Sequence, residues 1–185
     1  KKLLQIMKVN YSYLHQQFNE IEPYIKDIRK LVKSTEFTFG KYVNKFENNF
    51  SKFLNIKNVI GVNNGTDALI LCLKALDIRK GDEVITVCNT FYATVGAIVT
   101  AGAKPVFCDV TDDFLLDPND FQKKITKNTR AVIPVHLTGR VFEINLIREI
   151  CRDHSISIVE DAAQSFGAYD SKGAKTGAIG IAGAF

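Results

Sequence analysis

The feature that most constrains the fold is a change of pattern at Val59, after which short apolar runs alternate with segments of helical periodicity. Apolar runs of this kind suit strands that are covered on both faces, and helical connections suit parallel crossovers. The pattern therefore predicts an α/β domain in which helices cover both faces of an open sheet. The predicted strands are "VIGV" (59–62), "EVITVC" (83–88), "PVFCDV" (105–110), "RAVIPVH" (130–136) and "SISIVED" (155–161).

Residues 1–54 have a helical pattern instead. In "YLHQQFNEIEPYIKDIRKLV" the apolar residues recur at steps of three and four, which is typical of an amphipathic helix. Pro23 interrupts this pattern, and we expect it in the first turn of the second half. The stretch "YVNKFENNFSKFL" predicts another helix. We therefore divide the chain into an N-terminal helical segment, 1–54, and an α/β domain, 55–185.

The last residues, "KTGAIGIAGAF", stop at Phe185 inside an apolar run that has the character of a strand. We expect this sequence to be part of a longer protein, so that the α/β domain is incomplete. A naturally short chain is the alternative.

Charge and composition exclude several classes of protein. The 185 residues carry a net charge of +4, but the basic residues form no stripe, so nothing favours a nucleic-acid partner. No apolar window is long enough to span a membrane, and the apolar run in residues 1–9 is too short for a signal peptide. The four cysteines form no CxxC pair, which favours reduced core thiols in a cytoplasmic protein. The three histidines form no local metal motif, although a site assembled across the fold stays open.

In open α/β sheets, ligands bind beyond the carboxyl ends of the strands, so the residues after each predicted strand are the candidates. "NNGTDAL" follows the first strand. One interpretation is an ordinary helix start, in which Gly65 makes a tight turn, Thr66 caps the helix and Asp67 occupies the first turn. The other is an anion site, where backbone N–H groups at the helix start hold a phosphate.

Two further strand ends carry weaker candidates. Phe91 and Tyr92 open a helix after the second strand, where they either pack in the core or offer a flat surface for a cofactor ring. His136 follows the fourth strand, and a buried, hydrogen-bonded histidine is as good an interpretation as a functional one.

The most informative strand end is "IVEDAAQ". The strand is apolar, so an ionised Asp161 at its end is costly to bury unless it is paired. Asp161 could cap a following helix, but the small residues Ala162 and Ala163 leave space beside the carboxylate for a cationic ring nitrogen. A phosphate cradle, an aromatic plate and a carboxylate together fit pyridoxal 5'-phosphate, whose pyridinium nitrogen takes an acidic partner.

Five motifs in order and spacing identify a family. "GVNNGTDAL", "GDEVITVCNTFYAT", "AGAKPVFCDV", "IPVHLTGR" and "IVEDAAQSFGA" resemble the DegT/StrS family of pyridoxal-phosphate-dependent sugar aminotransferases, from about Phe39 to Phe185. The resemblance implies the aspartate-aminotransferase-like large domain, with a mixed, mostly parallel seven-stranded sheet that has helices on both faces. The family's C-terminal small domain is absent from this sequence.

The resemblance also implies roles for particular residues. Gly65, Thr66 and Asp67 match the phosphate-binding turn, and Phe91 matches the aromatic ring stacked on the cofactor. Asp161 matches the carboxylate paired with the ring nitrogen, and Gln164 matches a residue beside the ring oxygen. The family's Schiff-base lysine follows in an "SFxxxK" segment after "GAF", which is where this sequence stops. Lys172 and Lys175 fall in an expected exposed turn and are no substitutes.

The activity implied by the resemblance is transfer of an amino group, from a donor such as glutamate, to a nucleotide-linked keto-sugar by a homodimer. A sugar dehydratase of the same family is the alternative, because it differs by a histidine at the lysine position. If the chain is complete, a non-catalytic relic without the lysine is a further alternative. A nicotinamide-binding domain is disfavoured, because it predicts GxGxxG after the first strand where this chain has "NNGTDA".

Overall fold

The computed structural model describes residues 10–185, which divide into two compact units between Phe46 and Glu47. The interpretation of residues 1–9 as too short for a signal peptide lies outside the described residues. None of the helices in the described part of the chain has the length and apolar character needed to cross a membrane.

The first unit is helical. It contains α1 (Leu14–Gln17) and α2 (Glu22–Ser34), and α3 (Lys41–Leu54) begins in it and continues into the second unit. Pro23 lies in the first turn of α2, as predicted, because proline fixes a helical φ and its missing N–H would have no partner there. The helix ends at Ser34 and is capped by Thr35, which adopts a left-handed conformation with φ 57°.

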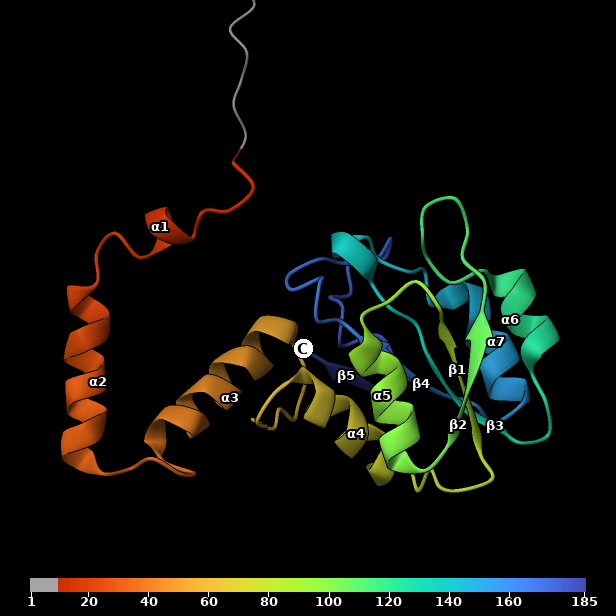
Figure 1. Ribbon diagram of the computed structural model, residues 1–185, viewed down its shortest axis with the longest axis horizontal. Helices are drawn as coiled ribbons and strands as arrows, with labels where there is room; N and C mark the ends of the chain where they lie inside the picture. The colour runs from red at the N-terminus through yellow and green to blue at the C-terminus, as the bar shows by residue number, and fades with distance from the viewer. Residues whose placement is uncertain (1–9) are drawn as a thin grey trace, which may run out of the picture. The chain divides into compact units, whose positions relative to one another are not determined.

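The second unit holds a five-stranded sheet in the order β2-β1-β3-β4-β5, in which every pairing is parallel (Figure 1). The strands are β1 (Glu83–Val87), β2 (Lys104–Cys108), β3 (Thr129–Ile133), β4 (Ser157–Asp161) and β5 (Ala182–Ala184). The connecting helices are α4 (Gly65–Ala75), α5 (Tyr92–Ala101), α6 (Pro118–Lys124) and α7 (Asn145–Asp153), with a 3₁₀ turn at Leu137–Gly139.

Helices cover both faces of the sheet, which confirms the predicted fold class. Residues of α4 and α5, such as Leu73 and Ile98, form one core with Val84 and Val159 of the strands. The opposite core contains residues of α6 and α7 together with Ile85 and Ile158. Adjacent strand residues alternate between the two cores because successive side chains in a strand point to opposite faces.

One predicted strand is wrong. The run "VIGV" (59–62) has no regular secondary structure and pairs with no strand of the described chain. Ile60 is 78% exposed, and the N–H of Gly61 donates to Oε1 of Glu47 at 2.8 Å instead of to a neighbouring strand. The run at the end of the chain is confirmed as β5. The family resemblance implies a mixed sheet of seven strands, whereas the described residues form five strands that all pair in parallel.

Candidate active site

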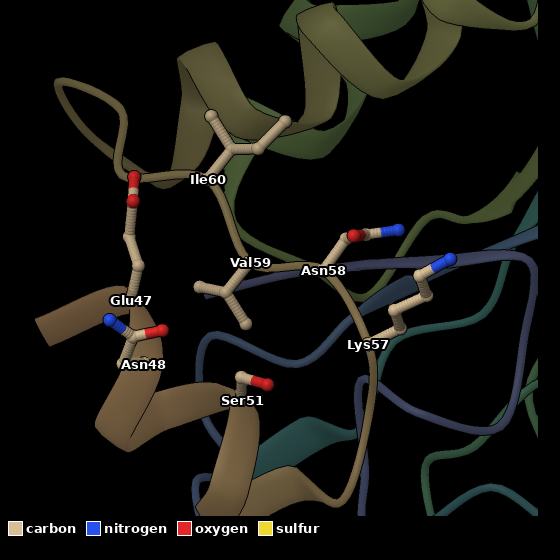
Figure 2. A pocket seen from close by; sticks show the side chains of 7 residues that line it. All are labelled: Glu47, Asn48, Ser51, Lys57, Asn58, Val59 and Ile60. Carbon is tan, nitrogen blue, oxygen red and sulfur yellow. The ribbon is translucent and has the colours of Figure 1, made fainter. Parts of the chain in front are cut away.

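One cavity of about 260 Å³ lies between the second half of α3 and the segment 57–60 that follows it (Figure 2). Its lining is mostly polar and includes Glu47, Ser51 and Lys57. None of the residues that the sequence singled out as candidates belongs to it. It therefore has no part in the predicted site.

A second cavity, of about 220 Å³, lies at the carboxyl ends of the strands. It brings together five of the six predicted cofactor residues, and Asp67 is the one that does not line it. These five come from the start of α4, the start of α5, and the end of β4 with the segment after it, which are far apart in the sequence. The lining consists of Gly65, Thr66, Leu69, Thr90, Phe91, Ala93, Val135, Asp161, Ala163, Gln164, Ala184 and Phe185.

The start of α4 differs in detail from the prediction, because Asn64 rather than Thr66 caps the helix. The side chain of Asn64 accepts from the N–H of Asp67 at 2.9 Å. The Asp67 carboxylate in turn accepts from the amide groups of Asn63 and Asn64, both at 3.2 Å. Asp67 thus belongs to the cap. Within residues 10–185, the N–H groups of Gly65 and Thr66 have no hydrogen-bond partner, as expected for the first turn of a helix.

Gly65 is required by a close approach rather than by the tight turn we expected. A Cβ atom at this position would lie 2.8 Å from the carbonyl oxygen of Phe185, closer than such atoms pack. The glycine therefore allows the start of α4 and the end of β5 to meet at the cavity.

Phe91 precedes the first residue of α5 and stays outside the core. Its side chain is 59% exposed, and its ring centroid lies 4.3 Å from that of Tyr92. The core-packing interpretation of these two aromatics is therefore wrong. A ring that is exposed at the mouth of a cavity is available to stack on a planar ligand.

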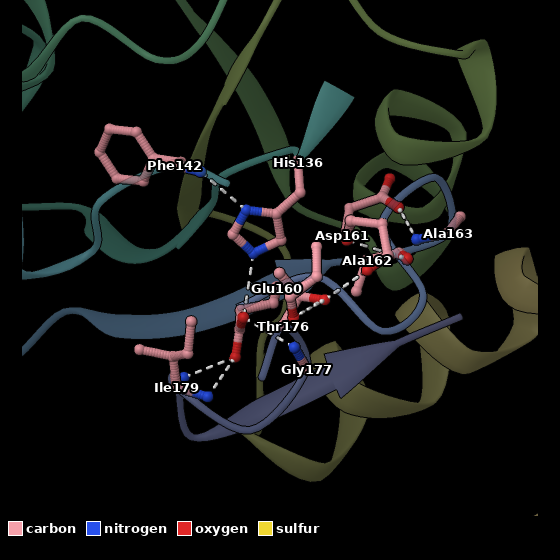
Figure 3. Close-up of polar contacts among 12 residues, drawn as sticks. His136, Phe142, Glu160, Asp161, Ala162, Ala163, Thr176, Gly177 and Ile179 are labelled. Carbon is pink, nitrogen blue, oxygen red and sulfur yellow. Dashed lines mark hydrogen bonds and ion pairs between the residues drawn. The ribbon is translucent and has the colours of Figure 1, made fainter. Parts of the chain in front are cut away.

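Asp161 ends β4, and its carboxylate is held from two sides. Oδ2 accepts from the hydroxyl of Thr94 at 2.7 Å. Oδ1 accepts from the N–H of Ala163 at 3.3 Å (Figure 3). The hydroxyl groups of Thr94 and Thr90 lie 2.9 Å apart. Since Thr94 donates its proton to Asp161, Thr90 must be the donor in that second bond. No helix follows Asp161, so the helix-cap alternative is wrong.

Among residues 10–185, the same carboxylate has no cationic partner. Asp161 is 7% exposed, and no nitrogen of Lys, Arg or His in the described residues lies within 4.0 Å of it. A buried carboxylate with hydrogen bonds but no counter-charge suits a cationic ligand group.

Gln164 lies at the rim of the cavity and is oriented by the backbone. Its Oε1 accepts from the N–H of Thr138 at 2.9 Å. Because this donor fixes which amide atom is the oxygen, the Nε2 group remains free to donate to a ligand. Thr138 has a left-handed φ of 55°, an uncommon conformation for a β-branched residue.

The two acidic residues of "IVEDAAQ" belong to opposite faces of the sheet. Asp161 contacts Thr94 on the side of α5, whereas Glu160 bonds to Nε2 of His136 at 3.0 Å. Both Glu160 and His136 are fully buried and neither lines the cavity. Of the two interpretations of His136, the structure therefore supports the buried, hydrogen-bonded histidine.

Sequence reasoning missed Thr90 and Thr94. Their spacing of four residues, at the point where β1 gives way to α5, was the available signal. Lys172 is exposed, as expected, but Lys175 is half-buried, because its Nζ donates to the carbonyl of Phe53 at 2.5 Å. Neither lysine lines the cavity.

The residues of this cavity fit pyridoxal phosphate. The unpaired N–H groups of α4 and the Thr66 hydroxyl suit a phosphate, and Phe91 suits the face of the ring. The unpaired Asp161 carboxylate suits the pyridinium nitrogen. The fold and this cavity together define a cofactor-binding α/β domain.

Comparison with known proteins shows which domain it is: the chain belongs to the DegT/DnrJ/EryC1/StrS aminotransferase family, whose model matches residues 19–185. This confirms the resemblance drawn from the five motifs and extends it towards the N-terminus. The family is pyridoxal-phosphate dependent.

Individual relatives agree. The chain is 40% identical over 147 residues to the GDP-perosamine synthase of Vibrio cholerae, covering 79% of this chain and 40% of the relative. It is 36% identical over 159 residues to the dTDP-3-amino-3,4,6-trideoxy-alpha-D-glucose transaminase of Micromonospora megalomicea subsp. nigra, covering 85% and 42%.

A solved structure shares the fold. NtdA from Bacillus subtilis, crystallised with its bound cofactor PMP, matches with a TM-score of 0.82 and 31% identity over 95% of this chain and 41% of that one. The chain thus spans less than half the length of the relatives that it matches.

Proposed function

We propose that the protein is a pyridoxal-phosphate-dependent aminotransferase that moves an amino group, from a donor such as glutamate, to a nucleotide-linked keto-sugar. The observation that carries this proposal is the Asp161 carboxylate, which is buried, held by Thr94 and without a cationic partner in the described part of the chain. It lies in a cavity that also contains the start of α4. The relatives named as sugar transaminases support the class of substrate.

In this proposal each residue has a defined task. The N–H groups of Gly65 and Thr66 bind the phosphate, and Phe91 covers one face of the ring. Asp161 holds the proton on the ring nitrogen, and Nε2 of Gln164 donates to the ring oxygen. When bound, the cofactor supplies the electron sink that amino-group transfer requires. Thr94 keeps the Asp161 carboxylate oriented towards the ring.

We further propose that the protein works as a homodimer in the cytoplasm. The four cysteines support a reducing compartment, because all are free thiols.

The test uses the full-length protein reconstituted with pyridoxal phosphate. We expect the cofactor absorbance to change when glutamate is added, and 2-oxoglutarate and an amino-sugar to form when a nucleotide-linked keto-sugar follows. Asp161→Asn should lower this turnover on the order of a hundredfold or more, because it removes the charge that faces the ring nitrogen. Asp153→Asn, at the exposed end of α7, is the matched control. Failure to bind pyridoxal phosphate would overturn the proposal, as would full activity of Asp161→Asn.

A further inference from the structure

Glu160 is a buried acid that the proposed chemistry does not use. Its carboxylate accepts four hydrogen bonds (Figure 3). Oε1 accepts from the N–H groups of Ile179, at 2.7 Å, and Gly180, at 2.6 Å. Oε2 accepts from the N–H of Gly177 at 2.8 Å and from Nε2 of His136 at 3.0 Å. Three of the four donors therefore belong to one short backbone segment, 177–180.

His136 supports this arrangement in a single protonation state. Its Nδ1 faces the N–H of Phe142 at 3.0 Å and so must be the acceptor of that bond. The proton of the neutral ring is then on Nε2, which donates to Glu160. Because both nitrogens are used and the side chain is fully buried, His136 acts on Glu160 and has no group left for a ligand.

The segment 177–180 leads directly into β5, and it packs tightly against the end of that strand. A Cβ atom at Gly177 would lie 2.3 Å from the ring of Phe185. A Cβ atom at Gly183 would lie 2.3 Å from the Cα of Gly177. The segment 177–180 therefore limits where Gly183 and Phe185 can lie, in addition to the parallel pairing of β5 with β4. Ala184 and Phe185 both line the cavity.

We propose that Glu160 is a positioning residue for the cofactor cavity. Its carboxylate binds the backbone N–H groups of segment 177–180 and thereby positions the residues of β5 and Phe185 that line the cavity. Only a carboxylate offers enough lone pairs to satisfy four donors, since the nitrogen of a glutamine would face two N–H groups as a donor itself. The inference rests on the proposed function for the identity of the cofactor. It does not rest on it for the role of Glu160 in the fold.

The experiment compares Glu160→Gln with Glu143→Gln in the full-length protein. Glu143 is a suitable control because it also holds the segment after β4, through the hydroxyl of Ser171 at 2.6 Å, but does not line the cavity. Two quantities are measured: amide hydrogen exchange at Gly177, Ile179 and Gly180 without cofactor, and the dissociation constant for pyridoxal phosphate.

For Glu160→Gln we expect exchange at these amides to rise by about tenfold or more, as for loss of hydrogen bonds to a charged group. The dissociation constant should rise by about the same factor, whereas Glu143→Gln should change neither quantity. Unchanged exchange, or raised exchange with unchanged cofactor affinity, would overturn the inference. If the wild-type protein binds no pyridoxal phosphate, the proposed function fails, while the exchange data still decide the role of Glu160.

A second variant keeps the test available if Glu160→Gln does not fold. His136→Leu removes one of the four donors to Glu160, the one that shares Oε2 with Gly177, and also removes the Nδ1 acceptor of the Phe142 N–H. We therefore expect exchange to rise more at Gly177 than at Gly180, whose N–H binds the other oxygen. Equal changes at the two amides, or none, would contradict the proposed arrangement.

Discussion

The hydroxyl group of Thr94 donates to Oδ2 of Asp161 at 2.7 Å, although the two residues lie 67 positions apart in the sequence. Both are buried, and Thr94 is fully so. Helix α5 therefore fixes one oxygen of a carboxylate that ends β4, while the turn after β4 holds the other. The orientation of Asp161 depends on two elements rather than on its own strand alone.

This relationship predicts the effect of Thr94→Val in the full-length protein. Valine has the shape of threonine but leaves Oδ2 without its donor, so we expect unfolding to require about 1.5–3 kcal/mol less free energy, the range for hydrogen bonds to charged groups. Cofactor affinity should fall as well. Urea unfolding and a pyridoxal phosphate titration measure the two effects. Thr94→Ser, which keeps the hydroxyl, is the control, and equal behaviour of the two variants would contradict the prediction.

Gly65→Ala should lower both stability and cofactor affinity, because its methyl group would press on the Phe185 carbonyl at 2.8 Å. Overpacking of this kind costs about 1–3 kcal/mol. Gly96→Ala provides the contrast: this glycine lies inside α5, and a methyl group there meets nothing within 4 Å. It should stabilise the protein by about 0.4–1 kcal/mol, because alanine favours the helix. Thermal and chemical unfolding measure the stability of the two variants. A stability change of the same sign in both would contradict the prediction.

The cysteines should differ in reactivity. Burial raises the pKa of Cys108 and that of Cys151 to about 12, so the reactive thiolate is scarce in both at pH 8. Cys88 is exposed at the end of β1. Alkylation of the native protein, followed by peptide mass spectrometry, should label Cys88 first and leave Cys108 and Cys151 unmodified until denaturant is added. Early labelling of Cys108 or Cys151 would show that their surroundings are open.

The Glu83 carboxyl should make the stability of the protein depend on pH. Hydrogen bonds from Thr126 and Lys104 hold the pKa of this carboxyl below its usual value. A pKa that is lower in the folded state gives stability that is fully present above the unfolded-state pKa and is lost as the pH falls through the folded-state value. Glu83→Gln should therefore destabilise the protein at pH 7, by about 1 kcal/mol, and converge with the wild type in acid. Glu149→Gln, exposed on α7, is the control. A difference that persists at pH 3 would contradict this origin.

Much of the fold could be predicted because the strands are apolar on both faces. "EVITVC", "RAVIPVH" and "SISIVED" lie close to β1, β3 and β4 because burial on both faces leaves a continuous apolar run. "VIGV" has the same appearance, but a strand also needs a partner, which a local pattern does not report. Its Gly61 N–H finds Glu47 instead.

The residues of the candidate site could be predicted where they line the cavity themselves. They could not be predicted where they act by holding another residue in place. Phe91 and Asp161 follow or end strands of the sheet, whose carboxyl ends the topology brings together, and Gly65 reaches the same cavity at the start of α4. Thr94 and Glu160 owe their roles to residues that are distant in the sequence, so no local motif marks these two residues as important. Alternation along β4 did offer one clue, since Glu160 and Asp161, as neighbours in a strand, must face opposite sides.

The contact between Gly65 and Phe185 has a consequence for synthesis. Gly65 is synthesised about 120 residues before Phe185, its contact partner. At 5–20 residues per second, the delay between the two is roughly 6–24 s. During that interval α4 has no β5 to pack against, and the cavity lacks the wall opposite the first turn of α4. A nascent chain without β5 lacks one wall of the cavity, so under the proposed function we expect cofactor loading to follow the synthesis of β5. Pausing of translation before that strand would lengthen the time for which the apolar face of α4 is open to other partners.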